Sequence, residues 1–397
     1  MNYQLSRRSF LSTSAAIALT QLLLGCSNTG TISQILFLED SIPAQLISDF
    51  SRTIGKENQV KFKPQTQIYQ IFDSLLNWQQ SEKTAQQTKG LFDKIFNKSI
   101  VNHGLTTLGD FWLQSAIKQN LIQPLSIKDI SSWQNLPTKW QQLVRRNPQG
   151  KLTANGMIWG APYRWGSTVI AYRSDKLEQQ GINVSDWSDL WQESLRDRIS
   201  LLDSPREVIG LTLKKLGHSY NTANLDSVPN LETELLALHQ QAKLYSLDHY
   251  LEPLILGDTW VAVAWSTDIL PLLKRYPDLK FIIPQSGASL WADIWVQPQV
   301  SKNSTEPTNS NESKAVIESW INFCWQPKAA KQISLFTNGI SPILSSLKSE
   351  DIPQDLQENV FLNSEILNSS ASEFLLPLTS ETEQQYRDMW LKIRQSV

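Results

Sequence analysis

The sequence is poor in the residues from which metal centres and nucleophilic active sites are built. It has two cysteines and four histidines among 397 residues, and no histidine stands at metal-ligand spacing from a cysteine, an aspartate or another histidine. It also lacks a Gly-x-Ser-x-Gly turn and a glycine-rich phosphate loop. We therefore expect no metal, no cofactor and no enzyme activity.

Long apolar runs and an excess of basic charge are missing as well. The apolar stretch from Ala15 to Leu24 is too short to span a bilayer, and no later stretch approaches 18 apolar residues. The net charge is −2, and loss of residues 1–25, which contain two arginines and no acid, would make it −4. Nucleic acid is not an expected partner, and a cationic ligand is weakly favoured.

The N-terminus has the order of features that is typical of an export signal. A twin-arginine pattern, Ser6-Arg-Arg-Ser-Phe-Leu11, precedes the apolar stretch, which ends in Leu23-Leu-Gly-Cys26. This ending resembles the lipobox of bacterial lipoproteins, which implies cleavage after residue 25, lipid on Cys26 and a protein held on the periplasmic side of a membrane. The alternative is a buried N-terminal helix with an incidental cysteine. Cys324 then has no disulfide partner and is expected to be a core thiol.

The apolar spacing of the mature chain predicts an α/β protein with two lobes. Strands at 33–38 and 60–62 alternate with helices at 43–54 and 67–78, which favours a largely parallel, doubly wound sheet. Residues 79–103 are expected to be a loop with a short helix. After residue 173 the pattern restarts, with a strand at 199–202, helices at 205–216 and 232–244, and strands at 260–264 and 280–284. A strand at 290–296 is expected to return to the first lobe. The predicted division is 26–168 plus 290–338 for lobe 1 and 169–289 plus 339–397 for lobe 2.

Two segments are expected to organise a cleft between the lobes. Residues 158–172 read as an aromatic loop running into a β-branched strand, which would line the cleft floor with Trp165 and cross between the lobes. Residues 201–210 read as a short strand that breaks into a helix and brings Glu207 to the cleft.

Further carboxylates stand beside tryptophans. Asp268 follows Trp265 at the end of a predicted strand, and Asp293 shares a strand face with Trp291 because side chains alternate. An indole face attracts a cation by about 0.5–2 kcal/mol, and a carboxylate makes a charge-assisted contact with an ammonium. This set, with Glu207, suits a flexible aliphatic chain that bears ammonium ends.

Each acid also has a purely structural interpretation. The segment Ser204-Pro-Arg-Glu207 fits a helix capping box. Asp268 could be the N-cap of the next helix. Asp293, inside an apolar strand, could form an internal salt bridge, because a buried charge needs a partner.

Four segments together are similar to the extracellular solute-binding proteins of bacterial ABC importers, and most to their polyamine (spermidine/putrescine) branch. They are Trp159–Tyr172, Leu202–Val208, Ala264–Asp268 and Leu290–Asp293. The resemblance extends over residues 33–397. It implies a periplasmic-binding-protein fold whose two lobes close on a ligand by hinge motion, and a membrane permease as the partner. We expect a monomer.

The resemblance also implies roles for individual residues. Glu207, Asp268 and Asp293 match acids that contact amine nitrogens, and Trp265 and Trp291 match aromatic walls. Three further positions belong to the implied site: Asp40 after the first strand, Phe111, which keeps a ring but no hydroxyl, and Ser204, which replaces a carboxylate. Arg164 adds a positive charge near the aromatic segment.

The leading hypothesis is a lipid-anchored binding protein that captures a polyamine for an importer. The same fold could instead bind a cationic amino-acid derivative, an anion or a metal, and an anion would be favoured if Arg164 and Arg206 both faced the cleft. A hydrolase with two carboxylates and a scaffold lipoprotein without ligand are further alternatives.

Overall fold

The computed structural model describes residues 33–54, 60–87, 103–128, 130–299, 311–357, 359–362 and 370–396. The predicted signal peptide and Cys26 lie outside these residues. In the part of the chain that is described, no helix is both long and apolar enough to cross a membrane.

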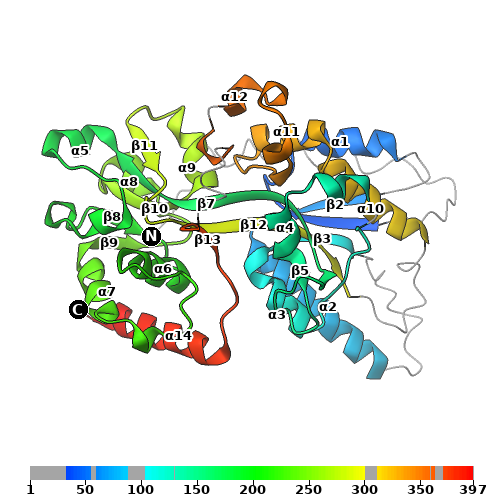
Figure 1. Cartoon of the computed structure of the whole chain (residues 1–397), viewed down its shortest axis with the longest axis horizontal. Helices are drawn as coiled ribbons and strands as arrows, with labels where there is room; N and C mark the ends of the chain where they lie inside the picture. Colours follow the sequence, from blue (N-terminus) through cyan, green and yellow to red (C-terminus); the bar gives the residue numbers. More distant parts are fainter. Residues whose placement is uncertain are drawn as a thin grey trace, which may run out of the picture.

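An 11-stranded sheet runs through the whole molecule (Figure 1). At one end β1 (Ser33–Leu38) pairs in parallel with β2 (Val60–Gln65) and β3 (His103–Gly109). At the other end β8 (Ile199–Leu201) pairs in parallel with β9 (Ala242–Tyr245) and β10 (Val261–Trp265). These parallel ends, each covered by helices, are the two lobes, and they confirm the predicted doubly wound α/β class.

Two long antiparallel strands join the lobes. The first part of β7 (Ala161–Arg173) pairs with β12 (Ser289–Pro298), and its second part pairs with β10 and with β11 (Leu279–Ile282). β12 in turn pairs with β3. The prediction that residues 158–172 cross between the lobes and that residues 290–296 return to the first lobe is therefore confirmed. The expected aromatic loop is itself strand, because its backbone is paired from Ala161 onward.

Helices cover both ends of the sheet (Figure 1). Those of the first lobe are α1 (Ala44–Thr53), α2 (Ile68–Gln87), α3 (Leu113–Lys118), α4 (Thr138–Val144), α10 (Asn311–Cys324) and α11 (Pro327–Phe336). Those of the second lobe are α5 (Ser174–Gln180), α6 (Pro205–Lys215), α7 (Leu231–Gln241), α8 (Glu252–Leu256), α9 (Ser266–Leu273) and α14 (Ser380–Gln395). Short elements complete the fold: β4 (Ile122–Gln123), β5 (Arg145–Arg146), β6 (Met157–Ile158), β13 (Glu373–Phe374), α12 (Gln354–Gln357) and 3-10 turns, among them Asp110–Trp112.

Three of the predicted boundaries were wrong by three residues or more. Strand β2 continues to Gln65 rather than ending at Phe62. Helix α2 continues to Gln87 rather than ending at Trp78, because the Gln, Lys and Glu residues that follow have good helix propensity without an apolar stripe. The helix predicted to reach Leu244 ends at Gln241, and the next residues form β9. Pairing of β9 with β8 outweighs the helical spacing there.

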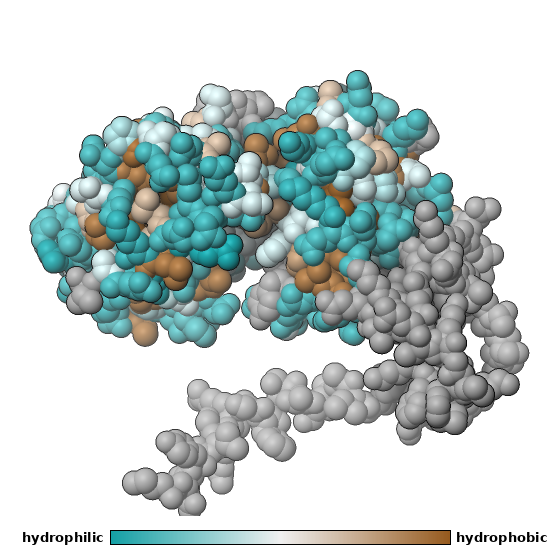
Figure 2. Space-filling model, turned by 90° about the horizontal axis from the view of Figure 1, so that it is seen from below, coloured by the Kyte–Doolittle hydropathy of each residue, from teal (hydrophilic) through white to brown (hydrophobic). Residues whose placement is uncertain are grey.

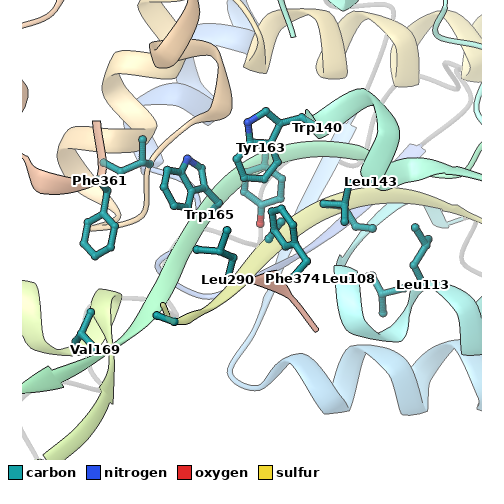
Figure 3. Close-up of a cluster of buried hydrophobic side chains, with 14 of the residues drawn as sticks. Leu108, Leu113, Trp140, Leu143, Tyr163, Trp165, Val169, Leu290, Phe361 and Phe374 are labelled. Atoms are coloured by element: carbon teal, nitrogen blue, oxygen red, sulfur yellow. The ribbon is translucent and has the colours of Figure 1, made fainter. Parts of the chain in front are cut away.

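The core follows the crossing strands from one lobe to the other (Figure 3). Trp165 of β7 is buried, with its ring centroid 5.5 Å from that of Trp140 and 5.9 Å from that of Phe361. Phe361 also stacks on Phe281 of the second lobe, with the ring centroids 6.1 Å apart. Ile340 forms an antiparallel β-bridge with Trp165. The segment that contains Ile340 and Phe361 thus packs between the lobes, and the division of the chain predicted above stays a prediction.

Cys324 lies at the end of α10 and is buried, and burial raises the pKa of its thiol. These surroundings are those of a core thiol.

Candidate functional site

The site is built on one face of the two crossing strands. In the β7–β12 ladder Arg164 lies opposite Asp293 and Gly166 opposite Trp291, and cross-strand neighbours point to the same side of a sheet. The Oγ1 of Thr168 and the Oγ of Ser289 lie 2.6 Å apart on that side. We call these six residues the polar stripe: Arg164, Gly166 and Thr168 of β7 with Asp293, Trp291 and Ser289 of β12.

The polar stripe runs from the first lobe to the second. Trp265, at the end of β10, lies opposite Thr168 in the β7–β10 ladder and extends the stripe. Seen from below, the molecule is hollowed between its two lobes (Figure 2).

Asp293 is held by the protein's own arginine. Its Oδ2 lies 2.6 Å from Nη2 and 2.8 Å from Nε of Arg164, and the two residues are only 4% and 6% exposed. The Nη1 of Arg164 donates to the carbonyl of Thr337 at 3.2 Å. Burial lowers the pKa of Arg164, but the charge of Asp293 and its hydrogen bond more than offset this and raise it. Of the two interpretations of Asp293, the structure shows the internal salt bridge.

Glu207 lies in the first turn of α6, where it faces the polar stripe. Its Oε2 accepts hydrogen bonds from Thr168 Oγ1 at 3.0 Å and Ser289 Oγ at 2.7 Å. Ser204 is the N-cap but makes no side-chain capping bond, so the alternative interpretation of this segment as a capping box was wrong. Burial raises the pKa of Glu207, and the two hydroxyl donors and the charge of Arg206 offset only part of that effect.

Asp268 lies in the first turn of α9. Its Oδ2 accepts from Tyr250 Oη at 2.6 Å and its Oδ1 from Thr267 Oγ1 at 3.2 Å. The N-cap of this helix is Trp265, so the interpretation of Asp268 as an N-cap was wrong. Burial raises the pKa of Asp268, opposed mainly by the Tyr250 hydrogen bond and also by the charge of Arg164.

Glu207 and Asp268 differ from Asp293 in one respect. Among the described residues, no lysine, arginine or histidine forms an ion pair with either carboxylate. Their hydrogen-bond partners are neutral hydroxyls. Two carboxylates beside half-exposed indoles can therefore accept a cation from outside the chain.

The remaining predicted site residues are spread more widely. Phe111, in the first lobe, is half-buried, and its ring centroid lies 6.0 Å from Cζ of Arg206 in the second lobe, so this contact spans the interlobe gap. Ser204 is half-buried at the start of α6. Asp40 is exposed in the turn after β1, with φ of 59°. Trp165 points away from the polar stripe into the core, because it alternates with Arg164 along β7 (Figure 3).

The hydroxyl partners Thr168, Ser289 and Tyr250 were not predicted from the sequence. The alternation of side chains along β7 and β12 could have indicated Thr168 and Ser289. Thr168 is four residues from Arg164 and Ser289 two residues from Trp291, so each lies on the same strand face as its neighbour. Asp110 was not predicted either; its buried Oδ1 accepts from Ala292 N–H at 2.8 Å. Burial raises the pKa of Asp110 to about 7.

No three His, Cys, Asp or Glu side chains among the described residues are placed to hold a metal ion. A family model described as bacterial extracellular solute-binding protein matches residues 101–364, a span that contains the whole polar stripe. The chain belongs to this family.

Relatives of this solute-binding protein are known by function and by structure. It is 23% identical to the spermidine/putrescine-binding periplasmic protein of Salmonella typhimurium over 266 residues, 67% of this chain and 70% of the relative. It is 25% identical to the putrescine-binding periplasmic protein SpuD of Pseudomonas aeruginosa over 300 residues, 71% of this chain and 76% of the relative. The structure of the spermidine/putrescine ABC transporter substrate-binding protein PotD from Streptococcus pneumoniae superimposes with a TM-score of 0.73 at 19% identity, covering 92% of this chain and 98% of that one. This similarity establishes the two-lobed periplasmic-binding-protein fold.

Proposed function

We propose that this protein is the substrate-binding component of an ABC importer and captures a polyamine-like cation between its lobes. The observation that carries the proposal is the pair Glu207, which is buried, and Asp268, which is half-buried: both accept hydrogen bonds from hydroxyls, and neither forms an ion pair among the described residues. A desolvated carboxylate is costly unless an opposite charge compensates it. Two protonated amines on one flexible chain would supply that charge.

The aromatic residues of the stripe fit the rest of such a ligand. Trp265 and Trp291 are half-exposed, and Trp265 lies across from Thr168, whose hydroxyl binds Glu207. Indole faces pack against methylene groups and attract ammonium groups. Relatives named for spermidine and putrescine binding support the same ligand class.

Release and uptake would follow from motion of the lobes. Phe111 and Arg206 contact each other across the gap, so opening the lobes would separate them. A ligand can favour the closed form only by binding it more tightly than the open form. The closed complex would then dock on a membrane permease, as a monomer.

The N-terminal pattern supports the location that this role requires. We propose export by the twin-arginine segment, lipid attachment at Cys26 and a position on the periplasmic side of a membrane. Mass spectrometry of the protein purified from its native membrane would test this. Cys26→Ser should release the protein from the membrane fraction, and a fully membrane-bound variant would contradict the anchor.

Isothermal titration calorimetry tests the binding role. Putrescine and spermidine are titrated into the wild type and into Glu207→Gln, with Glu252→Gln as the matched control, since Glu252 is largely exposed on α8. We expect binding that Glu207→Gln weakens about tenfold through loss of a charge-assisted contact, and no change in the control. Absence of heat with any di- or triamine would overturn the proposal.

A second ligand class has a specific observation in its favour. Nε and Nη1 of Arg206 and Nε1 of Trp291 are buried donors without an acceptor among the described residues. A cationic amino-acid derivative would bring a carboxylate to such donors and an ammonium to Glu207. Titration with ornithine beside putrescine separates the two classes, because only the second class predicts tighter binding of ornithine.

A further inference from the structure

One corner of the polar stripe has the composition of an ammonium site. It combines the carboxylate of Asp293, the face of Trp291 and the carbonyl oxygen of Thr337. A carboxylate and a carbonyl accept the N–H groups of a cation, and an indole face attracts its charge. All three groups surround a single point: Asp293 and Trp291 come from β12, and Thr337 follows α11.

That point is already occupied by a side chain of the protein. The guanidinium of Arg164 donates to Asp293 from Nε at 2.8 Å and to the Thr337 carbonyl from Nη1 at 3.2 Å. Its Cζ lies 5.7 Å from the ring centroid of Trp291. Each group of the corner therefore contacts Arg164.

The arginine is held in this position by its surroundings. Arg164 and Asp293 are neighbours in the β7–β12 ladder, and Arg164 is 6% exposed. A Cβ built on Gly339 would lie 2.4 Å from Cγ of Arg164, so the backbone there packs directly against the arginine side chain. A guanidinium confined in this way does not leave its partner to make room for a ligand.

We propose that Arg164 is a tethered cation that replaces one ammonium of the ligand and thereby sets the number of charged amines that the site accepts. The inference rests on the proposed function. With Asp293 neutralised internally, Glu207 and Asp268 are the acids left for the solute. Two acids match the two ammonium groups of a diamine. The position that a third ammonium would take beside Asp293 is already occupied by the guanidinium of Arg164. Arg164 is thus a specificity-determining residue that favours putrescine over spermidine.

The test restores the corner for an external cation. Arg164→Ala removes the guanidinium and leaves Asp293 free, while Arg164→Lys keeps a tethered charge. Arg164→Ala/Asp293→Asn removes both charges and is the matched control. Putrescine, spermidine and ethylguanidinium, which replaces the deleted arm, are titrated calorimetrically into each protein.

We expect the wild type to bind putrescine more tightly than spermidine. In Arg164→Ala the preference should reverse, with spermidine and ethylguanidinium each binding at least about tenfold more tightly than to the wild type. Arg164→Lys should keep the wild-type preference for putrescine. The double variant should not show the tighter binding of spermidine and ethylguanidinium. If Arg164→Ala does not fold alone, recovery of its circular dichroism spectrum by ethylguanidinium supports the inference, and failure to recover overturns it.

The outcomes separate this inference from the proposed function. If the wild type binds putrescine and Arg164→Ala shows the same preference, the role of Arg164 is overturned and the binding function stands. If the wild type binds no amine and Arg164→Ala gains amine binding, the tethered cation stands and the proposed function falls. If no variant binds any cation, both are overturned.

Discussion

The Nη2 of Arg164 lies 2.6 Å from Oδ2 of Asp293, and this buried ion pair joins the two strands that cross between the lobes. It stands at one end of the polar stripe, and Glu207 closes the other end. The stripe therefore has one acid that the protein neutralises itself, while in the part of the chain that is described Glu207 and Asp268 accept hydrogen bonds from hydroxyls and form no ion pair. In the proposed function, this difference leaves Glu207 and Asp268 as the acids available to a cationic solute.

The ion pair is expected to be important for stability. Asp293→Asn would leave the buried Arg164 without a counter-charge, which typically costs about 3–5 kcal/mol of unfolding free energy. Urea denaturation measures the loss. Asp175→Asn is a suitable comparison, since its pair with Arg173 is partly exposed and should contribute about 1 kcal/mol or less. Equal losses of unfolding free energy in the two variants would contradict the importance of the buried ion pair for stability.

Amine binding should strengthen as the pH rises. Burial raises the pKa of Glu207 above its ordinary value of 4.5, so the carboxylate is still partly protonated where an exposed glutamate has ionised. An ammonium binds the ionised form, and affinity therefore rises with pH through the raised pKa. Calorimetry at several pH values between about 5 and 8, where amines stay protonated, should show this rise and a weaker rise in Glu207→Gln. A flat profile in the wild type would count against the role of Glu207.

Asp110 should make the protein less stable as the pH increases. Its pKa is raised from 3.8 to about 7, so the folded state holds a proton that the unfolded state has released in this range. Unfolding free energy then falls as the pH rises from 3.8 to about 7. Asp110→Asn keeps an acceptor for the Ala292 N–H and should remove part of the fall, on the order of 1–4 kcal/mol. Denaturation curves at pH 4 and pH 8 check this, and an unchanged difference between them would refute it.

Gly166 is expected to control the position of Trp291. A Cβ at this position would lie 2.4 Å from Cζ2 of Trp291 and 2.5 Å from Oγ of Ser266, so Gly166→Ala must displace the indole. We expect about tenfold weaker amine binding and a stability loss of about 1–3 kcal/mol.

Gly160→Ala is the matched control for that variant. Its Cβ would lie 3.0 Å from the terminal Cδ1 of Ile294, an atom that can move, and Gly160 lies outside the polar stripe. Amine affinity in this control should stay within about twofold of the wild type. Equal affinities in the two alanine variants would show that Trp291 takes no part in binding.

Closure of the lobes should depend on Phe111. Its ring faces Arg206 across the gap at 6.0 Å, a contact of about 0.5–2 kcal/mol. Phe111→Ala should shift the population toward the open form, lower ligand affinity by about 2–30-fold and increase the radius of gyration in small-angle X-ray scattering. Phe336→Ala, at an exposed ring on α11, should change neither quantity. A closed, tightly binding Phe111→Ala would contradict the proposed contact.

Much of the fold could be predicted because the local sequence patterns favour the same elements that the tertiary structure contains. The strand at Ser33–Leu38 has the predicted bounds and helix α6 begins at Pro205 as predicted, since apolar spacing and proline position pointed to the same structure. β9 could not be predicted, because only its pairing with the distant β8 makes these residues a strand.

Several residues of the site could be predicted from the sequence, but the contacts between their side chains could not. Alternation correctly placed Trp291 and Asp293 on one face. It also places Trp165 on the opposite face from Arg164, a consequence that the prediction of Trp165 as a ligand contact overlooked. The partner of Asp293 depends on the register between β7 and β12, which are separated by more than one hundred residues in the sequence. That register follows from tertiary packing and has no local sequence signal.

A crystal structure of the protein with putrescine bound would show whether Glu207 and Asp268 hold the ligand. We expect the two ligand nitrogens within hydrogen-bond distance of Glu207 and Asp268, with the guanidinium of Arg164 still on Asp293. A ligand nitrogen bound to Asp293 with Arg164 displaced, or a ligand bound outside the hollow between the lobes, would contradict this role.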